Sequence, residues 1–326
     1  MKGIRLKNLL LRLLPEWCVL IVLFAITLLL AEIIHAPLRM PSTGVFLFIG
    51  LTYLMPFLLM SIWILLPWPF LIYRGEFKDA TKRVLQQISY LFCFGMVMML
   101  HFHIKLWAPL INPISYDPVY ETIDRTCFFW MDPLIAWRGH WQIDWVNHLY
   151  FYLFLFMFVC SFIVHYLQGP GRFARVFLSS LLVQAFGAIA YLVAPAVGPF
   201  IYREGANTHV TSVEHNLLQI HQQLVAGGSK WLENHTDNNL AAGLAAMPSL
   251  HIAASSVFLY YAIKYSPWLA WIYWPCFAWF LFESMASGWH YGIDLIFGLV
   301  LSGTCIFLAN AWMKAHEDAC SGTADK

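Results

Sequence analysis

The chain has 326 residues, of which 60% are hydrophobic and only 11% are charged, and this composition excludes an ordinary water-soluble protein. The formal net charge of +1 provides no basic field to attract nucleic acid, so nucleic acid is excluded as a main partner. The seven cysteines include no Cys-x2-Cys pair and lie mostly in or beside apolar runs. This pattern predicts neither a disulfide framework nor a thiolate metal site.

Eight apolar runs are candidates for membrane-spanning helices, because a helix of about 20 apolar residues crosses the roughly 30 Å hydrocarbon core of a bilayer. The sequence therefore predicts an all-α, polytopic transmembrane helical bundle of about eight spans. The second run contains Pro56, Pro67 and Pro69, so we expect it to kink or to end early. The runs cover residues 17–34, 45–72, 84–106, 146–167, 176–194, 249–265, 268–286 and 291–313.

The distribution of Lys and Arg predicts the orientation of these spans. Eight spans place both termini on one side, and the segments on that side hold thirteen Lys and Arg residues against six on the other. This excess predicts cytoplasmic termini and places two long loops, 108–145 and 195–248, on the exoplasmic side. We expect an integral protein of the plasma or inner membrane in a bacterium, or of the Golgi or ER in a eukaryote.

The two long loops have different patterns. The second contains Val213, Leu217, Ile220 and Leu224 at helical spacing, which predicts an amphipathic helix that lies at the membrane interface or packs on the spans. The first is rich in aromatic and acidic residues and contains Asp-Pro turns, and we interpret it as a lid or scaffold without a chemical role.

The thirteen histidines do not indicate a metal site. His101 and His103 point to different helix faces, and His215 and His221 are six residues apart, so neither pair has the i, i+4 spacing of a helical zinc site. The sequence also lacks the His-Glu-x2-His motif of zinc proteases and the Gly-x-Ser-x-Gly motif of serine hydrolases. We expect no metal and no cofactor.

The residues that suit chemistry lie where two spans begin on the predicted exoplasmic side. His290 and Asp294 are four residues apart at the start of the last span, so on a helix they share a face. The carboxylate can then keep one ring nitrogen protonated while the other points outward as a base or nucleophile. The alternative is an ordinary hydrogen-bonded pair that stabilises a helix.

The sixth span begins with Pro248, Ser249 and His251. A proline and a serine at a helix start leave backbone N–H groups and a hydroxyl that suit an anion, and His251 is placed to donate a proton to a leaving oxygen. Two histidines, one carboxylate and an anion-binding helix end together indicate phosphoryl transfer.

These residues resemble a known family. Pro248-Ser249-x-His251 and His290-x3-Asp294 look like the second and third signature motifs of the type-2 phosphatidic acid phosphatase superfamily, integral membrane enzymes that cleave lipid phosphoesters through a phosphohistidine. The resemblance covers roughly residues 146–313. It implies that His290 is the nucleophile, that Asp294 orients it, and that His251 is the general acid that protonates the leaving alcohol and then activates the acceptor.

The chain departs from the pattern of this family at two motifs. The third motif usually begins with Ser-Arg, and these positions hold Glu283 and Ser284, so the arginine that would bind phosphate is missing. The first motif, Lys-x6-Arg-Pro, is absent from its usual place after the span that precedes Pro248. A similar spacing from Lys105 to Pro113 lies one pair of spans too early, and we interpret it as a chance match.

Other residues must then contact the phosphate. Ser249 is one candidate, Arg203 is the first candidate cation and Lys230 the second, with a solvated loop cation as the alternative for both. A Pro-x2-Gly-Pro element at 195–199 and a His-Tyr-x2-Asp third motif look most like the inositol phosphorylceramide synthase branch, whose members transfer a phosphorylated head group between lipids.

We therefore predict a metal-independent, integral-membrane lipid phosphatase or phosphotransferase that acts on a lipid phosphate or phosphodiester, with a lipid alcohol as a candidate acceptor. The resemblance divides the chain into accessory spans at 1–83, a six-span phosphatase-like catalytic domain at 84–313 and a cytoplasmic tail at 314–326. The alternatives are a transporter or lipid scramblase that uses the same polar residues as an intramembrane relay, and an inactive protein of the same fold. Hydrolysis versus transfer, the identity of the lipid and the oligomeric state stay open.

Overall fold

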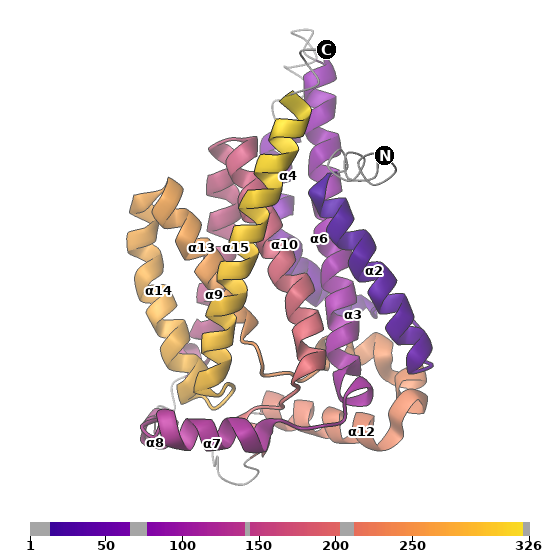
Figure 1. Cartoon of the computed structure of the whole chain (residues 1–326), viewed down its shortest axis with the longest axis vertical. Helices are drawn as coiled ribbons and strands as arrows, with labels where there is room; N and C mark the ends of the chain where they lie inside the picture. Colours follow the sequence, from indigo (N-terminus) through magenta and orange to yellow (C-terminus); the bar gives the residue numbers. More distant parts are fainter. Residues whose placement is uncertain (1–13, 66–76, 141–143, 203–211, 322–326) are drawn as a thin grey trace, which may run out of the picture.

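The computed structural model describes residues 14–65, 77–140, 144–202 and 212–321, and within these ranges all regular structure is helical (Figure 1). The predicted all-α fold is confirmed. The long helices are α2 (Pro15–Ile33), α6 (Phe77–Ile111), α9 (Asp144–Leu167), α10 (Pro170–Val193), α13 (Leu250–Tyr265), α14 (Pro267–Ala286) and α15 (Gly292–Ser321). The second predicted run is composite, with α3 (Thr43–Ile49), the π-helical segment η1 (Gly50–Leu54) and α4 (Met55–Leu65). The connecting segments contain α7 (Asp117–Cys127), α8 (Met131–Gly139), α11 (Pro199–Tyr202), α12 (Ser212–Asn239) and the 3-10 segment η2 (Leu240–Ala242).

Helices occupy each of the eight apolar runs, and six helical segments in the described residues are long and apolar enough to cross a membrane. The chain is therefore an integral membrane protein. The other two helices, α13 and α14, form a hairpin that packs against α9 and α15. α13 has only 16 residues, so it is shorter than a typical membrane-spanning helix. α14 is long enough but carries four tryptophans, a residue that is enriched at the membrane–water interface and makes the helix less apolar.

The spans run side by side, and three helices lie across one end of them (Figure 1). α2 begins and α15 ends at the same end of the bundle, which agrees with an even number of passes. α7, α8 and α12 lie across the opposite end, which we call the capped end.

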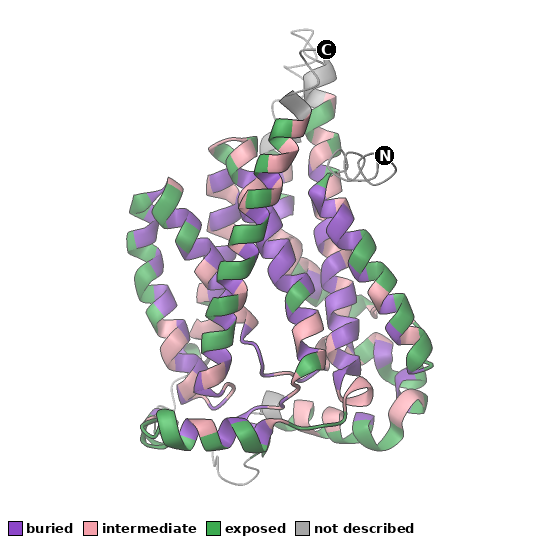
Figure 2. Cartoon of the chain, in the orientation of Figure 1, coloured by how far each residue is buried: buried purple, intermediate pink, exposed green. Residues whose placement is uncertain are grey.

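The packing is that of a protein surrounded by lipid. Figure 2 shows buried residues where helices face one another and exposed residues on the outer faces. One apolar cluster extends from Val19 in α2 to Met313 in α15, so the N-terminal helices share a core with the later ones. Large apolar side chains also lie on the outside, and Trp271 on α14 is 80% exposed. An apolar exterior around an apolar core suits the interior of a bilayer.

The second predicted run is interrupted ahead of its first proline. The helix widens to π geometry over Gly50–Leu54 and returns to α geometry at Met55. Pro56 has no N–H to donate to the carbonyl of Thr52, and its ring crowds that carbonyl, so a wider turn accommodates it. Pro67 and Pro69 lie outside the described residues.

Both long loops contain helices. The predicted amphipathic helix of the second loop is confirmed as α12, in which Leu224 is buried and Ile220 packs against the main core. α12 continues to Asn239 and changes direction at Gly228, whose φ of 56° favours glycine. The first loop forms α7 and α8.

Candidate active site

The two polar clusters predicted from the sequence meet near the capped end. Ser249 Oγ lies 3.3 Å from His290 Nε2, and the Ser249 backbone N–H donates to the backbone oxygen of Asp294 at 3.1 Å. Ser249 is fully buried and is the N-cap residue of α13. α13 and α15 approach closely here because Gly298 has no side chain, and a Cβ at this position would lie 2.6 Å from the Ser249 backbone oxygen.

His290 lies between Ser249 and Asp294. Its Nδ1 is 3.4 Å from Asp294 Oδ2, and the same Oδ2 accepts a hydrogen bond from the Tyr291 N–H at 2.9 Å. The Asp294 side chain is fully buried, whereas the His290 side chain is 12% exposed. A carboxylate beside Nδ1 favours the tautomer with the proton on that nitrogen, so the Nε2 lone pair is directed at the start of α13.

His251 lies in the first turn of α13 and is held by aromatic rings of α9. Its ring centroid is 4.7 Å from that of Phe154 and 5.0 Å from that of Tyr150, both in edge-on contact. The Tyr150 hydroxyl is 3.1 Å from Ser284 Oγ, and the Ser284 backbone oxygen accepts the His290 N–H at 3.0 Å. The structure therefore brings His251, His290, Asp294 and Ser249 into one cluster.

A buried carboxylate of α7 holds the segments on either side of the cluster. Asp117 accepts hydrogen bonds from the backbone N–H groups of Val197 and Gly198 at 3.0 Å each, and from the Tyr291 hydroxyl at 2.9 Å. The Asp117 residue is 0% exposed. Because Tyr291 directly follows His290, Asp117 ties the position of the imidazole to the loop that follows α10.

A second α7 carboxylate holds the start of α15. Asp124 Oδ1 accepts the Gly292 N–H at 3.0 Å, and the residue is 1% exposed. This N–H belongs to the first turn of α15 and has no partner within the helix, so the carboxylate both pairs it and complements the helix dipole. α7 therefore fixes the two residues that follow His290.

Two titratable groups of the capping helices border the cluster. Burial, together with the nearby carboxylate charges of Asp294 and Asp117, raises the pKa of Tyr120 to about 12. Its hydroxyl therefore stays protonated and donates to the Ala194 carbonyl at 3.2 Å. Burial lowers the pKa of His221 on α12, while the charge of Asp117 acts in the opposite direction.

A family model described as the PAP2 superfamily matches residues 119–308. The chain belongs to the PAP2 superfamily. The matched range runs from α7 into α15, so it contains both histidines and begins earlier than residue 146, where we expected the resemblance to begin. No curated protein and no solved structure matches the chain. The superfamily prediction is confirmed and the chain is a membrane phosphatase-like protein, whereas the inositol phosphorylceramide synthase branch stays a prediction.

The two departures from the PAP2 third motif have defined structural places. Glu283 forms a two-point ion pair with Arg138 of α8, with Nε to Oε2 and Nη2 to Oε1 distances of 2.8 Å each. Both side chains are less than 10% exposed, so each buried charge is compensated. Ser284 occupies the position of the missing arginine and contacts Tyr150. The pair attaches α8 to the end of α14, next to the loop that carries His290.

The three predicted phosphate contacts have different outcomes. Ser249 lies in the cluster. Arg203 falls outside the described residues. Lys230 is exposed on α12 after the change of direction at Gly228, where the neighbouring Ser229 hydroxyl donates to the Ile34 carbonyl at the end of α2. The described contacts of this segment are thus with the N-terminal helices, and the structure does not bring Lys230 together with the histidines.

No individual role was predicted for Asp117 and Asp124, which hold the loop that carries His290. A signal for them exists in the sequence, since Asp117, Glu121 and Asp124 are spaced i, i+4, i+7 and thus share one face of α7. All three are buried, so the acidic face points inward. An acidic stripe on a short helix beside apolar spans therefore indicated buried hydrogen-bond acceptors and not only a solvated surface.

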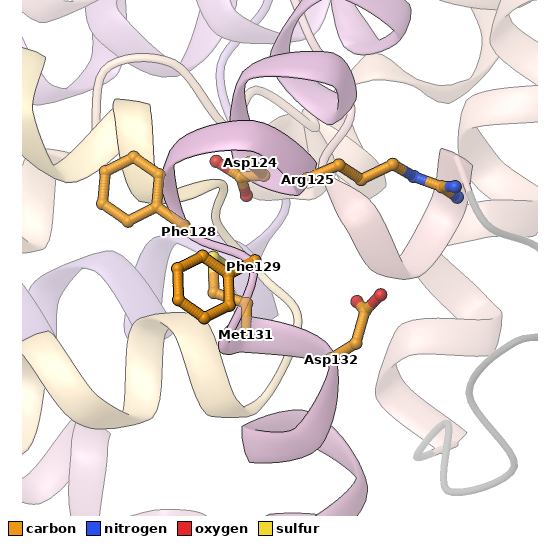
Figure 3. A pocket seen from close by; sticks show the side chains of 6 residues that line it. All are labelled: Asp124, Arg125, Phe128, Phe129, Met131 and Asp132. Carbon is orange, nitrogen blue, oxygen red and sulfur yellow. The ribbon is translucent and has the colours of Figure 1, made fainter.

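A small pocket of about 90 Å³ lies at the junction of α7 and α8 (Figure 3). Figure 3 shows the phenyl rings of Phe128 and Phe129 on one side, and the guanidinium of Arg125 directed away from them. The pocket borders the Asp124 carboxylate and does not contain the histidines. In the part of the chain that the structure describes, no group of three or more His, Cys, Asp or Glu side chains is arranged to hold a metal ion.

Proposed function

We propose that this PAP2 protein is a lipid phosphoesterase or phosphotransferase that forms a phosphohistidine at His290. The observation that carries the proposal is the position of His290, whose Nδ1 lies 3.4 Å from a buried carboxylate and whose Nε2 faces Ser249 at 3.3 Å. An imidazole with one nitrogen oriented by a carboxylate and the other directed at a helix start is an activated nucleophile beside an anion site.

The proposed reaction has two steps. In the first, the Nε2 lone pair of His290 attacks the phosphorus atom, the bond from phosphorus to the lipid oxygen breaks, and that oxygen takes a proton from protonated His251. In the second, water or an acceptor alcohol gives its proton to His251, its oxygen attacks phosphorus, and the P–N bond breaks. Hydrolysis and transfer use the same side chains and differ only in the acceptor.

The start of α13 supplies donors for the phosphate oxygens. The first N–H groups of a helix have no partner within the helix and carry the positive end of its dipole. The Ser249 N–H is already bonded to Asp294, so the donors are the Ser249 hydroxyl and the N–H groups of Leu250, His251 and Ile252. Because the nucleophile, the acid and the orienting carboxylate are all side chains, we propose a metal-independent reaction.

We further propose that the capped end faces the exoplasmic side and that the described start of α2 and end of α15 face the cytoplasm. The excess of Lys and Arg on the terminal side supports this orientation. The lipid head group then reaches His290 from the side while its tails stay in the bilayer. In this proposal, residues 84–313 form the catalytic domain, residues 1–83 are accessory and residues 314–326 form the cytoplasmic tail.

The test is an assay of the purified chain in proteoliposomes against phosphatidic acid, an isoprenyl diphosphate and a phosphoinositol lipid, with and without ceramide or diacylglycerol as acceptor. We expect phosphate release or an acceptor-dependent lipid product, lost in His290→Ala and retained in the control His148→Ala. His148 is an exposed histidine of α9 whose ring stacks on Tyr152. Full turnover by His290→Ala, or movement of lipid between leaflets with no chemical change to any lipid, contradicts the proposal.

A further inference from the structure

Lys105 lies beside the candidate active site although its helix precedes the range matched by the PAP2 family. It is near the end of α6, where the backbone of α6 packs against the segment that leads to Ser249. A Cβ on Gly243 in that segment would lie 2.9 Å from the Lys105 carbonyl carbon, so the two backbones are in direct contact. α6 is also fixed to α10 here, because the Asn112 amide donates to the Leu192 carbonyl at 2.9 Å.

The Lys105 ammonium lies over an aromatic ring of α10. Its Nζ is 5.6 Å from the ring centroid of Tyr191 on α10, and α10 packs against both α13, which carries His251, and α15, which carries Asp294. Lys105 thus lies against a helix that packs on both helices of the candidate site.

Among the described residues, the Lys105 ammonium has no anionic partner. In the part of the chain that the structure describes, Lys105 forms no ion pair and no side-chain hydrogen bond, and its side chain is only partly exposed. Three arginines of the same protein are each paired with a carboxylate: Arg125 with Glu121, Arg138 with Glu283 and Arg175 with Glu317. An unpaired cation within a membrane bundle is costly, and such residues usually serve a ligand or a transport path.

We propose that Lys105 binds the non-bridging oxygens of the lipid phosphate at His290 and supplies the positive charge that the altered third motif lacks. This inference rests on the proposed function. The ligand class is a phosphate ester of a lipid, and phosphomonoesters and phosphodiesters share the oxygens that an ammonium contacts. Neutralising these oxygens lowers the repulsion that the Nε2 lone pair meets as it approaches phosphorus.

The test compares the wild-type protein with Lys105→Met, Lys105→Arg and the matched control Lys264→Met. Lys264 is also a lysine over aromatic rings, 5.6 Å from the centroid of Tyr260 and 5.3 Å from that of Tyr265, but it lies at the C-terminal end of α13. Two quantities are measured on each full-length protein in detergent. They are the affinity for orthovanadate, a phosphate analogue, and kcat/KM with the lipid that the assay panel identifies.

We expect Lys105→Met to lower both quantities by roughly 10- to 100-fold, the size of a lost hydrogen bond to a charged group. Lys105→Arg keeps the charge and should recover part of the loss, and Lys264→Met should match the wild type. Equal melting temperatures show that the variants are folded, and Lys105→Gln replaces Lys105→Met if the latter does not fold.

The two proposals fail in distinguishable ways. An active wild type whose Lys105→Met variant keeps its vanadate affinity and kcat/KM overturns the role of Lys105 and leaves the proposed function intact. A wild type that binds vanadate through Lys105 but converts no lipid of the panel overturns the proposed function and leaves the anion site at Lys105 standing.

Discussion

The two histidines of the site are positioned by different interactions, hydrogen bonds for His290 and aromatic packing for His251. His290 lies in a loop in which the backbone N–H of each of residues 290, 291 and 292 donates a hydrogen bond to an oxygen of Ser284, Asp294 or Asp124. His251 lies inside a helix, and its ring packs against Tyr150 and Phe154. In the described part of the chain, the His251 ring makes no hydrogen bond.

This difference matches two different chemical tasks. A nucleophile needs one tautomer and one direction, and a carboxylate on the far nitrogen supplies both. A general acid–base group donates a proton to one oxygen and later accepts a proton from another. Ring packing that leaves both imidazole nitrogens without a fixed hydrogen-bond partner suits this role. The comparison therefore predicts that changes around the two histidines have different consequences.

The largest expected effects separate the two histidines directly. His290→Ala removes the nitrogen that we propose attacks phosphorus and should lower the turnover of every phosphoester by about 10⁴-fold or more. His251→Ala removes the proposed proton donor and should lower the turnover of a lipid ester by about 10²- to 10⁴-fold. An aryl phosphoester whose leaving group needs no proton should lose much less activity in His251→Ala. The measurement is kcat for both substrates in both variants.

The matched control for this pair is His148→Ala on the exposed face of α9, which should keep wild-type turnover of both substrates. If His251→Ala lowers kcat equally for the aryl and the lipid substrate, His251 does not protonate the leaving group. The proposed difference between the two histidines would then be wrong.

Asp294→Asn should produce the next largest effect. An amide at this position accepts a weaker bond from Nδ1 and can turn its own N–H toward that nitrogen, which moves the ring proton to Nε2 and blocks the lone pair. We expect turnover to fall by about 10²- to 10⁴-fold while the fold is retained, as judged by an unchanged melting temperature. Turnover within threefold of the wild type would show that the carboxylate does not orient His290.

Asp117→Asn tests whether α7 positions the nucleophile. The amide can place N–H groups against the N–H groups of Val197 and Gly198, which leaves buried donors unpaired and should cost about 1–3 kcal/mol of stability. Turnover should fall less than in Asp294→Asn. Tyr291→Phe removes only the hydroxyl that donates to Asp117, so it should cost about 0.5–1.5 kcal/mol.

Denaturant unfolding in detergent measures both α7-related variants. A stability of Asp117→Asn equal to that of the wild type would contradict the positioning role of α7, because the four hydrogen bonds of this buried carboxylate would then contribute nothing.

The smallest expected effect concerns His221 on α12, which interacts with Asp117. Because burial lowers the pKa of His221 in the folded protein, the unfolded state binds the proton first as the pH falls below about 6.5. The contribution of His221 to stability is therefore complete above that pH and is lost on acidification. Between pH 7.5 and 5.5 the melting temperature of the wild type should fall further than that of His221→Gln. Equal decreases would show that burial does not lower the pKa of His221.

The helical bundle could be predicted from the sequence because each membrane-spanning segment is identified from its own residues, without knowledge of its neighbours in space. Each of the eight runs is recognisable from its own length and composition, and Pro56 marks the interruption of the second. The contact of His290 with Asp294 was also predicted, although the structure places His290 in the loop before α15 and not on the same helix as Asp294. The amphipathic helix at 213–224 was predicted for the same reason, although its continuation past Gly228 was not.

The parts that escaped prediction depend on contacts between distant segments. Nothing near Asp117 in the sequence shows that residue 197 is its partner, and the ion pair of Arg138 with Glu283 joins residues 145 positions apart. Lys105 was interpreted as a chance match because its span comes early in the chain. Chain order does not determine which helices are neighbours, and α6 packs against α10 beside the start of α13.

The most direct test of the account is to trap the covalent intermediate. The purified chain is mixed briefly with a lipid labelled in its phosphate, quenched, and digested so that the labelled peptide is identified by mass spectrometry. We predict a phosphoryl group that survives base but not acid, located on His290 and missing in His290→Ala. Rapid conversion of the lipid with no label on the protein, or with the label on another residue, would contradict the account.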